Sequence, residues 1–269
     1  MCRDYKFDFH ITSLFKNDLF FQSLLFMLCR QFNQIWKIFQ MKNDFLGPAT
    51  SILFPKIDLT AVKGVLIDLD NTLYCFYPAH EVAMKAVFDL FRPFWPASFE
   101  AFYSQVQTVW STIFDEMGNV PLAHHRMLLF QRLAEELFIP HPFDIATRAN
   151  NLYFNTVYKL LKKQGPDKQA LAFLKECRRR KIKVCCVTDL FASIQTQKIK
   201  ALKLTRYIDF IVSNDEVGLD KPAPQIFLRG LKKLNMAADQ VIMVGDDVKK
   251  DIEGAEKLKI RAYHVTVCK

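Results

Sequence analysis

The chain lacks the sequence signals of several protein classes. Its seven cysteines show no regular spacing, and the two closest ones, Cys185 and Cys186, are neighbours inside an apolar run. A disulfide framework and a cysteine-based zinc site both need spaced cysteines, and the six histidines are dispersed. We therefore expect reduced, packed cysteines, no zinc site and a cytoplasmic protein.

Long apolar runs are also missing. The longest early run, residues 24–29, is far shorter than the roughly 20 residues that cross a bilayer, so no transmembrane segment is predicted. Acidic residues interrupt the start of the chain, and no small-residue cleavage site follows them. A secretory signal peptide is therefore not predicted either.

Residues 1–57 are interpreted as an N-terminal extension of unknown role. Apolar side chains recur at helical spacing between Leu25 and Phe39, which indicates an amphipathic helix that docks on protein. An alternative is that translation starts at Met41, so that residues 1–40 are not made. The sequence leaves both interpretations open.

The positive charge is concentrated in one segment. The formal net charge is +9, and residues 159–183 carry ten Lys and Arg against two Asp and Glu, a net of +8. Part of this run, residues 178–181, falls at the end of a predicted helix, where cations complement the helix dipole. We interpret the segment as a solvated face, which makes nucleic acid an unexpected partner. A polynucleotide-docking face is kept as an alternative.

From about residue 60 onwards, apolar runs alternate with helical segments. Continuous apolar runs, typical of strands buried on both faces, occur at residues 65–67, 184–187, 210–212, 241–244 and 262–267. Helical patterns lie between them at about residues 167–181, 193–204, 223–235 and 249–259. The alternation predicts an α/β fold, with a parallel sheet and helices on both faces.

Residues 75–158 interrupt this alternation. The segment is rich in aromatic residues, has helical periodicity, and is divided by prolines between residues 93 and 142. It has a net charge of −3, from five basic and eight acidic residues. We interpret it as an all-helical domain inserted into an α/β core made of residues 58–74 and 159–269.

Polar residues follow four of the predicted strands. They are Asp68 and Asp70, Thr188 and Asp189, Ser213 and Asn214, and Asp246 and Asp247. Ligands of open parallel sheets bind outside the carboxyl ends of the strands, so these side chains are expected to converge. Buried carboxylates are costly unless a cation accompanies them, and their hard oxygens suit Mg²⁺. The sequence therefore predicts a magnesium site at this edge.

Four motifs at these positions resemble, in order, those of the haloacid dehalogenase (HAD) superfamily. Asp68-Leu69-Asp70-Asn71-Thr72-Leu73 resembles the first motif, Thr188 the second, Lys221 within residues 220–227 the third, and Gly245-Asp246-Asp247 followed by Asp251 the fourth. The resemblance covers about residues 60–269. It implies a HAD-like Rossmannoid parallel sheet with a helical cap inserted between the first and second motifs.

The resemblance also implies catalytic roles. Asp68 would be the nucleophile that forms an aspartyl-phosphate, and Asp70 would act first as general acid and then as general base. Thr188 would hydrogen-bond a phosphoryl oxygen, and Lys221 would neutralise its charge.

The implied metal is Mg²⁺, with Asp68, Asp246 and the backbone carbonyl of Asp70 as ligands. Asp247 and Asp251 would contact the metal directly or through its ligands, and Asp251 could instead cap its helix. The sequence does not separate these two residues.

The reaction follows from Asp70. A halide leaving group needs no acid, so a carboxylate at this position favours phosphoryl chemistry. The predicted function is Mg²⁺-dependent hydrolysis of a small phosphate monoester, such as a sugar phosphate or a nucleotide. A phosphomutase, or a non-catalytic protein of the same fold, is the alternative. The sequence identifies neither the substrate nor the oligomeric state.

Several polar residues near the motifs have no implied role. Tyr74, Tyr77 and His80 follow the first motif, and whether they face the site is left open. Asp189 is expected to begin a turn, and His124 and His125 are expected on a solvated helix face.

Overall fold

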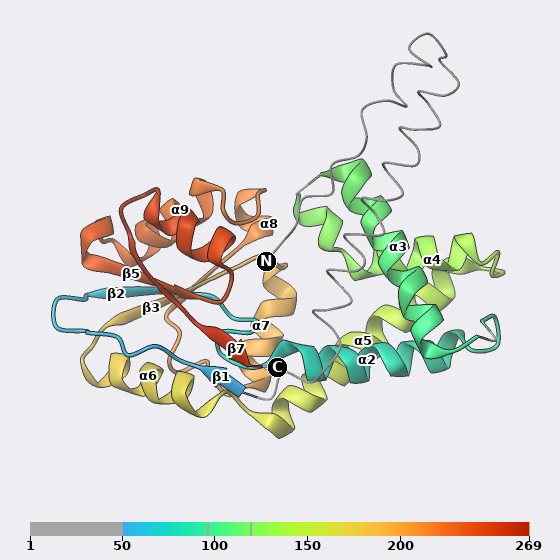
Figure 1. Ribbon diagram of the computed structural model, residues 1–269, viewed down its shortest axis with the longest axis horizontal. Helices are drawn as coiled ribbons and strands as arrows, with labels where there is room; N and C mark the ends of the chain where they lie inside the picture. Colours follow the sequence, from blue (N-terminus) through green and yellow to red (C-terminus); the bar gives the residue numbers. More distant parts are fainter. Residues whose placement is uncertain (1–50, 96, 119, 269) are drawn as a thin grey trace, which may run out of the picture. The chain divides into compact units, whose positions relative to one another are not determined.

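The computed structural model describes residues 51–95, 97–118 and 120–268 (Figure 1). The helical stripe expected between Leu25 and Phe39, and the alternative start at Met41, lie outside these residues.

A five-stranded parallel sheet forms the centre of the α/β core. Its strand order is β4–β3–β2–β5–β6, with every neighbouring pair parallel. The strands are β2 (Gly64–Ile67), β3 (Lys183–Thr188), β4 (Phe210–Ser213), β5 (Val241–Gly245) and β6 (Arg261–His264). The predicted α/β fold with a parallel sheet is therefore confirmed.

The register of the sheet aligns the strand ends that carry the motifs. Ile67 at the end of the central strand β2 lies opposite Cys186 on one side and Val244 on the other. Residues that follow β2, β3 and β5 are therefore brought to one edge of the sheet.

The last predicted strand is divided in two. The apolar run at residues 262–267 contributes to β6 and to a separate strand, β7 (Thr266–Cys268). Strand β7 pairs antiparallel with β1 (Ser51–Leu53), which lies inside the expected N-terminal extension. Part of that extension is therefore paired with the end of the chain.

Helices cover both faces of the sheet, with α9 on one side and α6 on the other (Figure 1). The helical elements of the core are α6 (Lys168–Arg179), α7 (Ala192–Ala201), α8 (Asn214–Val217), α9 (Pro224–Leu234), η2 (Ala238–Gln240), η3 (Val248–Ile252) and α10 (Glu253–Glu256). The side chains of β2 point alternately to the two faces of the sheet. Leu66 packs in the cluster that contains Phe227 of α9, and Val65 and Ile67 pack in the other cluster. Burial on both faces explains why β2 reads as a continuous apolar run.

Residues 76–164 form helices α2 (Phe76–Phe91), α3 (Phe99–Met117), η1 (Pro121–His124), α4 (Arg126–Glu136) and α5 (Pro142–Gln164). Helix α5 packs against both α2 and α4, and buried aromatic side chains, among them Phe91, Phe102, Phe130 and Tyr153, fill the interior. Helix α5 continues to Gln164, past the boundary expected at residue 158. We refer to residues 76–164 as the cap.

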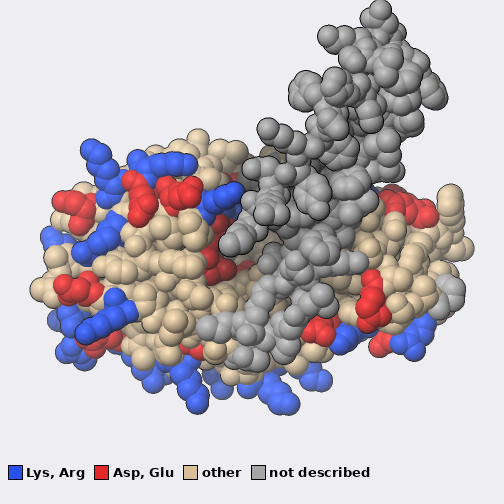
Figure 2. All heavy atoms as spheres, viewed as in Figure 1, with Lys and Arg blue, Asp and Glu red and all other residues tan. Residues whose placement is uncertain are grey.

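The basic segment lies on the outer surface of the core. Figure 2 shows Lys and Arg side chains along the edge where α6 and the end of α5 lie in Figure 1. Within the segment, Arg179 and Arg180 both pair with Glu176, and Arg179 remains largely exposed. Exposed ion pairs of this kind fit a solvated face. Among the described residues, no helix has the length and apolarity needed to cross a membrane.

Candidate active site

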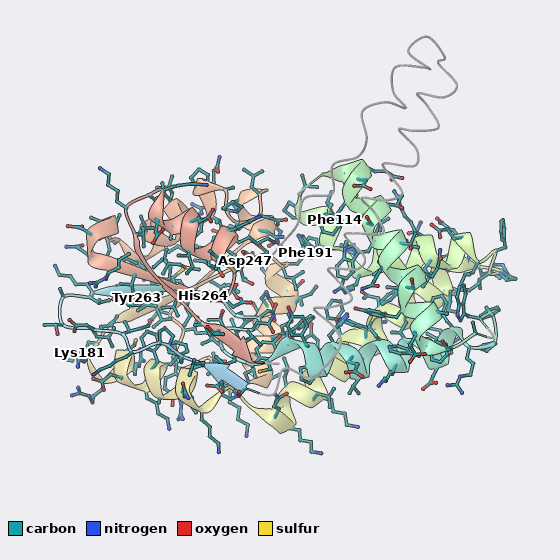
Figure 3. All side chains as sticks on the ribbon, in the orientation of Figure 1. Phe114, Lys181, Phe191, Asp247, Tyr263 and His264 are labelled. Atoms are coloured by element: carbon teal, nitrogen blue, oxygen red, sulfur yellow. The ribbon has the colours of Figure 1, made fainter. Side chains whose placement is uncertain are left out.

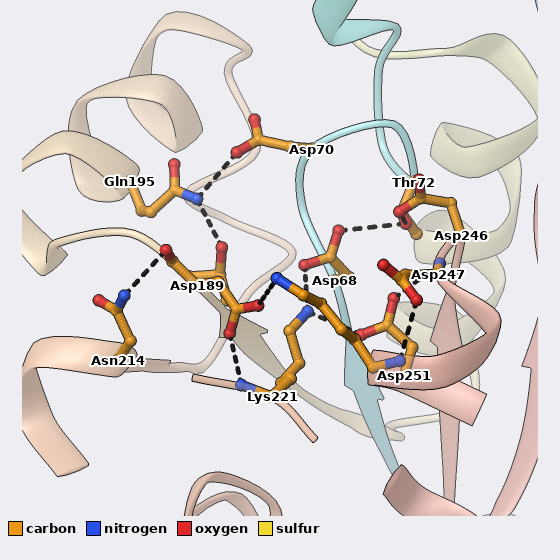
Figure 4. Close-up of polar contacts among 12 residues, drawn as sticks. Asp68, Asp70, Thr72, Asp189, Gln195, Asn214, Lys221, Asp246, Asp247 and Asp251 are labelled. Atoms are coloured by element: carbon orange, nitrogen blue, oxygen red, sulfur yellow. Dashed lines mark hydrogen bonds and ion pairs between the residues drawn. The ribbon is translucent and has the colours of Figure 1, made fainter. Parts of the chain in front are cut away.

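Residues of the first, third and fourth motifs meet at the carboxyl edge of the sheet (Figure 4). The Lys221 ammonium donates to Asp68 Oδ1 at 2.6 Å and to Asp251 Oδ1 at 2.7 Å. The Thr72 hydroxyl lies 3.3 Å from Asp68 Oδ2 and 3.3 Å from Asp246 Oδ1. Lys221 is buried, although a lysine on a loop is ordinarily solvated.

Three carboxylates form what we call the acidic cluster, made of Asp68, Asp246 and Asp251. One oxygen from each lies within 4.8 Å of the others. Burial raises the pKa of Asp68 well above its usual value, since Lys221 only partly opposes burial and the neighbouring carboxylates. Burial and the charge of Asp251 raise the pKa of Asp246 to about 7.

The acidic cluster suits a hard divalent cation. A single lysine faces two buried carboxylates and one half-buried carboxylate, so negative charge is in excess, and the donors are all oxygens. Mg²⁺ prefers such ligands, and its charge would favour the ionised forms that burial alone disfavours. The residues present therefore fit the metal that the sequence predicted.

The Asp70 carboxylate has a different environment, although Asp70 lies only two residues after Asp68. The Lys198 ammonium contacts both carboxylate oxygens, at 2.8 and 2.7 Å. Gln195 Nε2 donates to Asp70 Oδ2 at 3.1 Å, and the Tyr74 hydroxyl donates to Oδ1. Burial on its own would raise the pKa of Asp70, but the charge of Lys198 and these hydrogen bonds hold it below its usual value. Asp70 is therefore kept ionised.

Thr188 of the second motif is connected to Asp70 through Gln195. The Gln195 side-chain amide donates both to Thr188 Oγ1 and to Asp70 Oδ2, and Thr188 is 1% exposed. Because the Thr188 oxygen accepts from Gln195, its own proton is available to another acceptor. The Asp70 carboxylate is not part of the acidic cluster. The metal contact expected from the Asp70 backbone carbonyl stays a prediction.

Asp189 positions the loop that carries Lys221. Its carboxylate accepts from the Lys221 backbone N–H at 2.8 Å and from the Lys250 ammonium at 3.0 Å. Its backbone carbonyl accepts from Asn214 Nδ2 at 2.9 Å. The expectation that Asp189 only begins a turn is incomplete, because its side chain also orients the third motif.

The structure separates Asp247 from Asp251. Asp247, at the end of β5, is exposed and accepts from the backbone N–H groups of Lys249 and Lys250, so it caps η3 (Figures 3 and 4). Asp251 is 1% exposed and faces Lys221. A Cβ at Gly245 would overlap the Asp251 carboxylate, so this close approach requires glycine.

The two cap histidines differ: His124 is half-buried and His125 is exposed. His124 Nε2 lies 2.7 Å from Asp220 Oδ2, next to Lys221, and the His125 ring packs edge-on against Phe191 at 5.2 Å. The expectation of a solvated face is therefore wrong for His124, because Asp220 of the core pairs with it, whereas His125 remains exposed.

The residues that follow the first motif differ in their surroundings. Tyr74 reaches Asp70, as described above. His80 lies within the cap, with Nδ1 2.6 Å from the Tyr153 hydroxyl, and burial lowers its pKa well below the usual value.

Sequence reasoning missed Lys198, Gln195 and the pairing of His124 with Asp220. Gln195 and Lys198 lie three residues apart on α7, so they share a helix face. That spacing is the only sequence signal for the pair, and it is shared by many solvated helix surfaces.

Comparisons with known proteins cover the part of the chain that contains the motifs. The family model for haloacid dehalogenase-like hydrolases matches residues 62–259. The chain is 32% identical over 197 residues to ribulose-1,5-bisphosphate 5-phosphatase of Halopiger xanaduensis, covering 71% of this chain and 80% of that protein. It is 28% identical over 201 residues to glyceraldehyde 3-phosphate phosphatase of Pyrococcus abyssi, covering 74% and 79%.

A similar fold is found among solved structures. The structure of 2-haloacid dehalogenase from Pseudomonas syringae pv. tomato matches with a TM-score of 0.60 and 22% identity, over 75% of this chain and 85% of that one. The family match covers most of the chain, including all four motifs, and the fold is the one that the motifs implied. The chain belongs to the haloacid dehalogenase-like hydrolases.

Proposed function

We propose that the protein is a Mg²⁺-dependent phosphatase that hydrolyses a small phosphate monoester through an aspartyl-phosphate on Asp68. The contrast between Asp68 and Asp70 carries the proposal. One carboxylate lies in the acidic cluster beside Lys221, and the other is held ionised by Lys198. The phosphatase names of the relatives from Halopiger and Pyrococcus support the same reaction class.

In the first step an Asp68 oxygen would form a bond to phosphorus as the bond to the leaving-group oxygen breaks. The Thr188 hydroxyl has its proton free to donate to a phosphoryl oxygen, and Lys221 would offset the negative charge. Mg²⁺, held by Asp68, Asp246 and the Asp70 carbonyl with Asp251 beside them, would supply the positive charge that lets a carboxylate approach a phosphate dianion.

The proton balance of the reaction would rest on the pair formed by Asp70 and Lys198. Asp70 is ionised in this pair, so the proton that the leaving-group oxygen takes would come from the Lys198 ammonium by way of the Asp70 carboxylate. In the second step water would attack phosphorus, Asp68 would leave, and the proton of the water would return to Asp70. The sum is an alcohol and inorganic phosphate from an ester and water.

The cap would exclude bulk water and limit the substrate to small esters. Its contact to the catalytic loop runs through His124 and Asp220, directly before Lys221. We also propose a cytoplasmic location, which the buried thiols of Cys177, Cys185 and Cys186 support.

The test is a panel of phosphate esters, assayed for released phosphate with the full chain in Mg²⁺ and in EDTA. We expect hydrolysis of at least one small ester, abolished by EDTA and restored by excess Mg²⁺. Full activity in chelator, or isomerised sugar phosphate in place of free phosphate, would contradict the proposal.

A further inference from the structure

A pocket of about 420 Å³ lies between cap residues and core residues of α7 and the turn before it. From the cap it is lined by His125, Arg126, Asn150 and Phe154. From the core it is lined by residues around the start of α7, including Gln197 and Phe191, of which Phe191 is labelled in Figure 3. Its volume falls in the range of small-molecule sites. Among the described residues that line it, none is acidic.

A second, much smaller recess shares lining residues with this pocket and reaches Lys198. Arg126 and Phe154 also line a small recess that contains Lys198, whose ammonium binds Asp70. Two core residues of the pocket, Ile194 and Gln197, flank Gln195 and Lys198 on α7. Since Asp70 would face the leaving-group oxygen, the rest of the leaving group would extend into this pocket.

Arg126 is a cation without a carboxylate partner in the described part of the chain. Its guanidinium lies 3.6 Å from the centre of the Trp110 ring and 5.3 Å from that of Tyr153. These rings hold the plane of the guanidinium, and no described acidic group lies within ion-pair distance of it. A fixed, partly buried guanidinium is well suited to bind a carboxylate or phosphate through two parallel hydrogen bonds.

The surroundings of Arg126 add positive potential. Arg126 is the first residue of α4, whose N-cap His125 makes no side-chain capping bond and whose first turn has no acidic residue. The positive end of the helix dipole therefore lies beside the guanidinium. Burial lowers the pKa of the Lys198 ammonium, and the charge of Arg126 acts in the same direction. An uncharged leaving group would leave this positive region without a counter-charge.

We infer that the Arg126 pocket is a substrate subsite for a second anionic group, so that the enzyme selects phosphate esters whose leaving group carries a carboxylate or another phosphate. The inference rests on the proposed phosphatase reaction and adds the class of leaving group. Arg126 binds the second anion, while Asn150 and Gln197 offer hydrogen bonds and Phe154 and Phe191 enclose the carbon chain.

The test compares matched esters that differ only in the second anion. The first pair is 3-phosphoglycerate and glycerol 3-phosphate, which tests a carboxylate. The second is fructose 1,6-bisphosphate and fructose 6-phosphate, which tests a phosphate. We expect the ratio of kcat/KM for at least one pair to favour the ester with the second anionic group, and Arg126→Gln to lower that ratio about 10- to 100-fold, mainly through KM.

Arg132→Gln is the matched control. It removes an arginine from the same helix whose partner is Glu116 and which lies outside the pocket, so the ratio should be retained. Arg126→Lys keeps the charge without the planar fork and should fall between the wild type and Arg126→Gln.

The outcomes separate the subsite from the reaction. Hydrolysis of both members of each pair with equal efficiency, or an equal loss for both in Arg126→Gln, overturns the subsite and leaves the phosphatase assignment standing. A preference for a nucleoside monophosphate that Arg126→Gln does not change overturns it as well. If wild type hydrolyses no ester at all in Mg²⁺, the proposed function fails and the subsite fails with it.

Discussion

The two sides of the active site differ in their balance of charge. On one side Asp68, Asp246 and Asp251 share a single lysine, Lys221, and burial raises the pKa of Asp68 and Asp246. On the other side Asp70 stands alone against Lys198, with Gln195 and Tyr74 as further donors, and its pKa is lowered. The first side has an excess of negative charge, and the second is balanced.

This difference assigns different chemistry to two aspartates of one motif. Asp68 and Asp70 are separated only by Leu69, which is fully buried, so the chain directs the two carboxylates to different partners. A site that needs added positive charge is suited to metal and phosphate, and a balanced ion pair is suited to proton transfer. Because burial raises the pKa of Asp68, its ionised, nucleophilic form depends on added positive charge, whereas Asp70 is ionised by its pairing with Lys198.

Removing Lys198 should disrupt the ion pair with Asp70 and the proton transfer that depends on it. In Lys198→Met, only the hydrogen bonds from Tyr74 and Gln195 oppose the effect of burial, so the pKa of Asp70 rises. An Asp70 carboxylate that has protonated the leaving group then takes a proton back from solvent and cannot accept one from the attacking water. We expect kcat to fall by about 10²–10⁴, with phosphate retained on Asp68 after acid quench. The pH at which the remaining activity rises should shift upward.

The control for this variant is Lys200→Met, which removes an exposed lysine from the same helix. Its turnover and pH profile should match those of the wild type. A folded Lys198→Met protein with an unchanged pH profile and no retained phosphate would show that Lys198 has only a structural role.

Neutralising Asp246 should change the pH dependence of stability on the side of the site that has excess negative charge. The folded-state pKa of Asp246 is raised to about 7, above its unfolded value of about 4. Its contribution to stability is therefore full below about pH 4 and is lost as the pH rises through about 7. In EDTA, we expect Asp246→Asn to be more stable than the wild type at pH 8, with a smaller difference at pH 5.

With Mg²⁺ at pH 8, the wild type should become more stable than Asp246→Asn. The metal stabilises only a chain that has its carboxylate ligands, so thermal unfolding at pH 8 should show a Mg²⁺-dependent rise in Tm for the wild type and little for Asp246→Asn. A wild-type Tm that does not respond to Mg²⁺ would contradict the metal site.

The smallest effect is expected at Asp247, which lies beside the cluster without joining it. Asp247→Ala removes a helix cap, which costs about 1 kcal/mol and lowers Tm by roughly 2–4 °C. Asp251→Asn removes a charge from Lys221 and should reduce kcat/KM far more than Asp247→Ala does. The reverse order of the two effects on kcat/KM would contradict the roles assigned to these residues.

The fold and the positions of the motif residues could be predicted because they depend on local patterns. Buried parallel strands have continuous apolar sequences, and the residues that follow them meet at one edge of the sheet. Asp68, Thr188 and Asp246 follow directly from this rule. Lys221 lies on a loop, and only the resemblance pointed to it.

The partners of Asp70 could not be predicted, because they depend on the tertiary structure. Lys198 is 128 residues from Asp70 in the chain, and a lysine on a short helix is ordinarily solvated. The same holds for His124, whose partner Asp220 lies 96 residues away. Asp247 and Asp251 are four residues apart, and only the turn of η3 decides which of them is buried.

The most direct test of the account is to trap the intermediate in Asp70→Asn and to look for it in Asp68→Asn. With p-nitrophenyl phosphate, whose leaving group needs no proton, Asp70→Asn should release a burst of nitrophenol and then stall, because the attacking water lacks a base. Mass spectrometry after acid quench should find the phosphate on Asp68, and Asp68→Asn should show neither burst nor label. A label on another residue, or normal steady-state turnover by Asp68→Asn, would contradict the division of roles between the two aspartates.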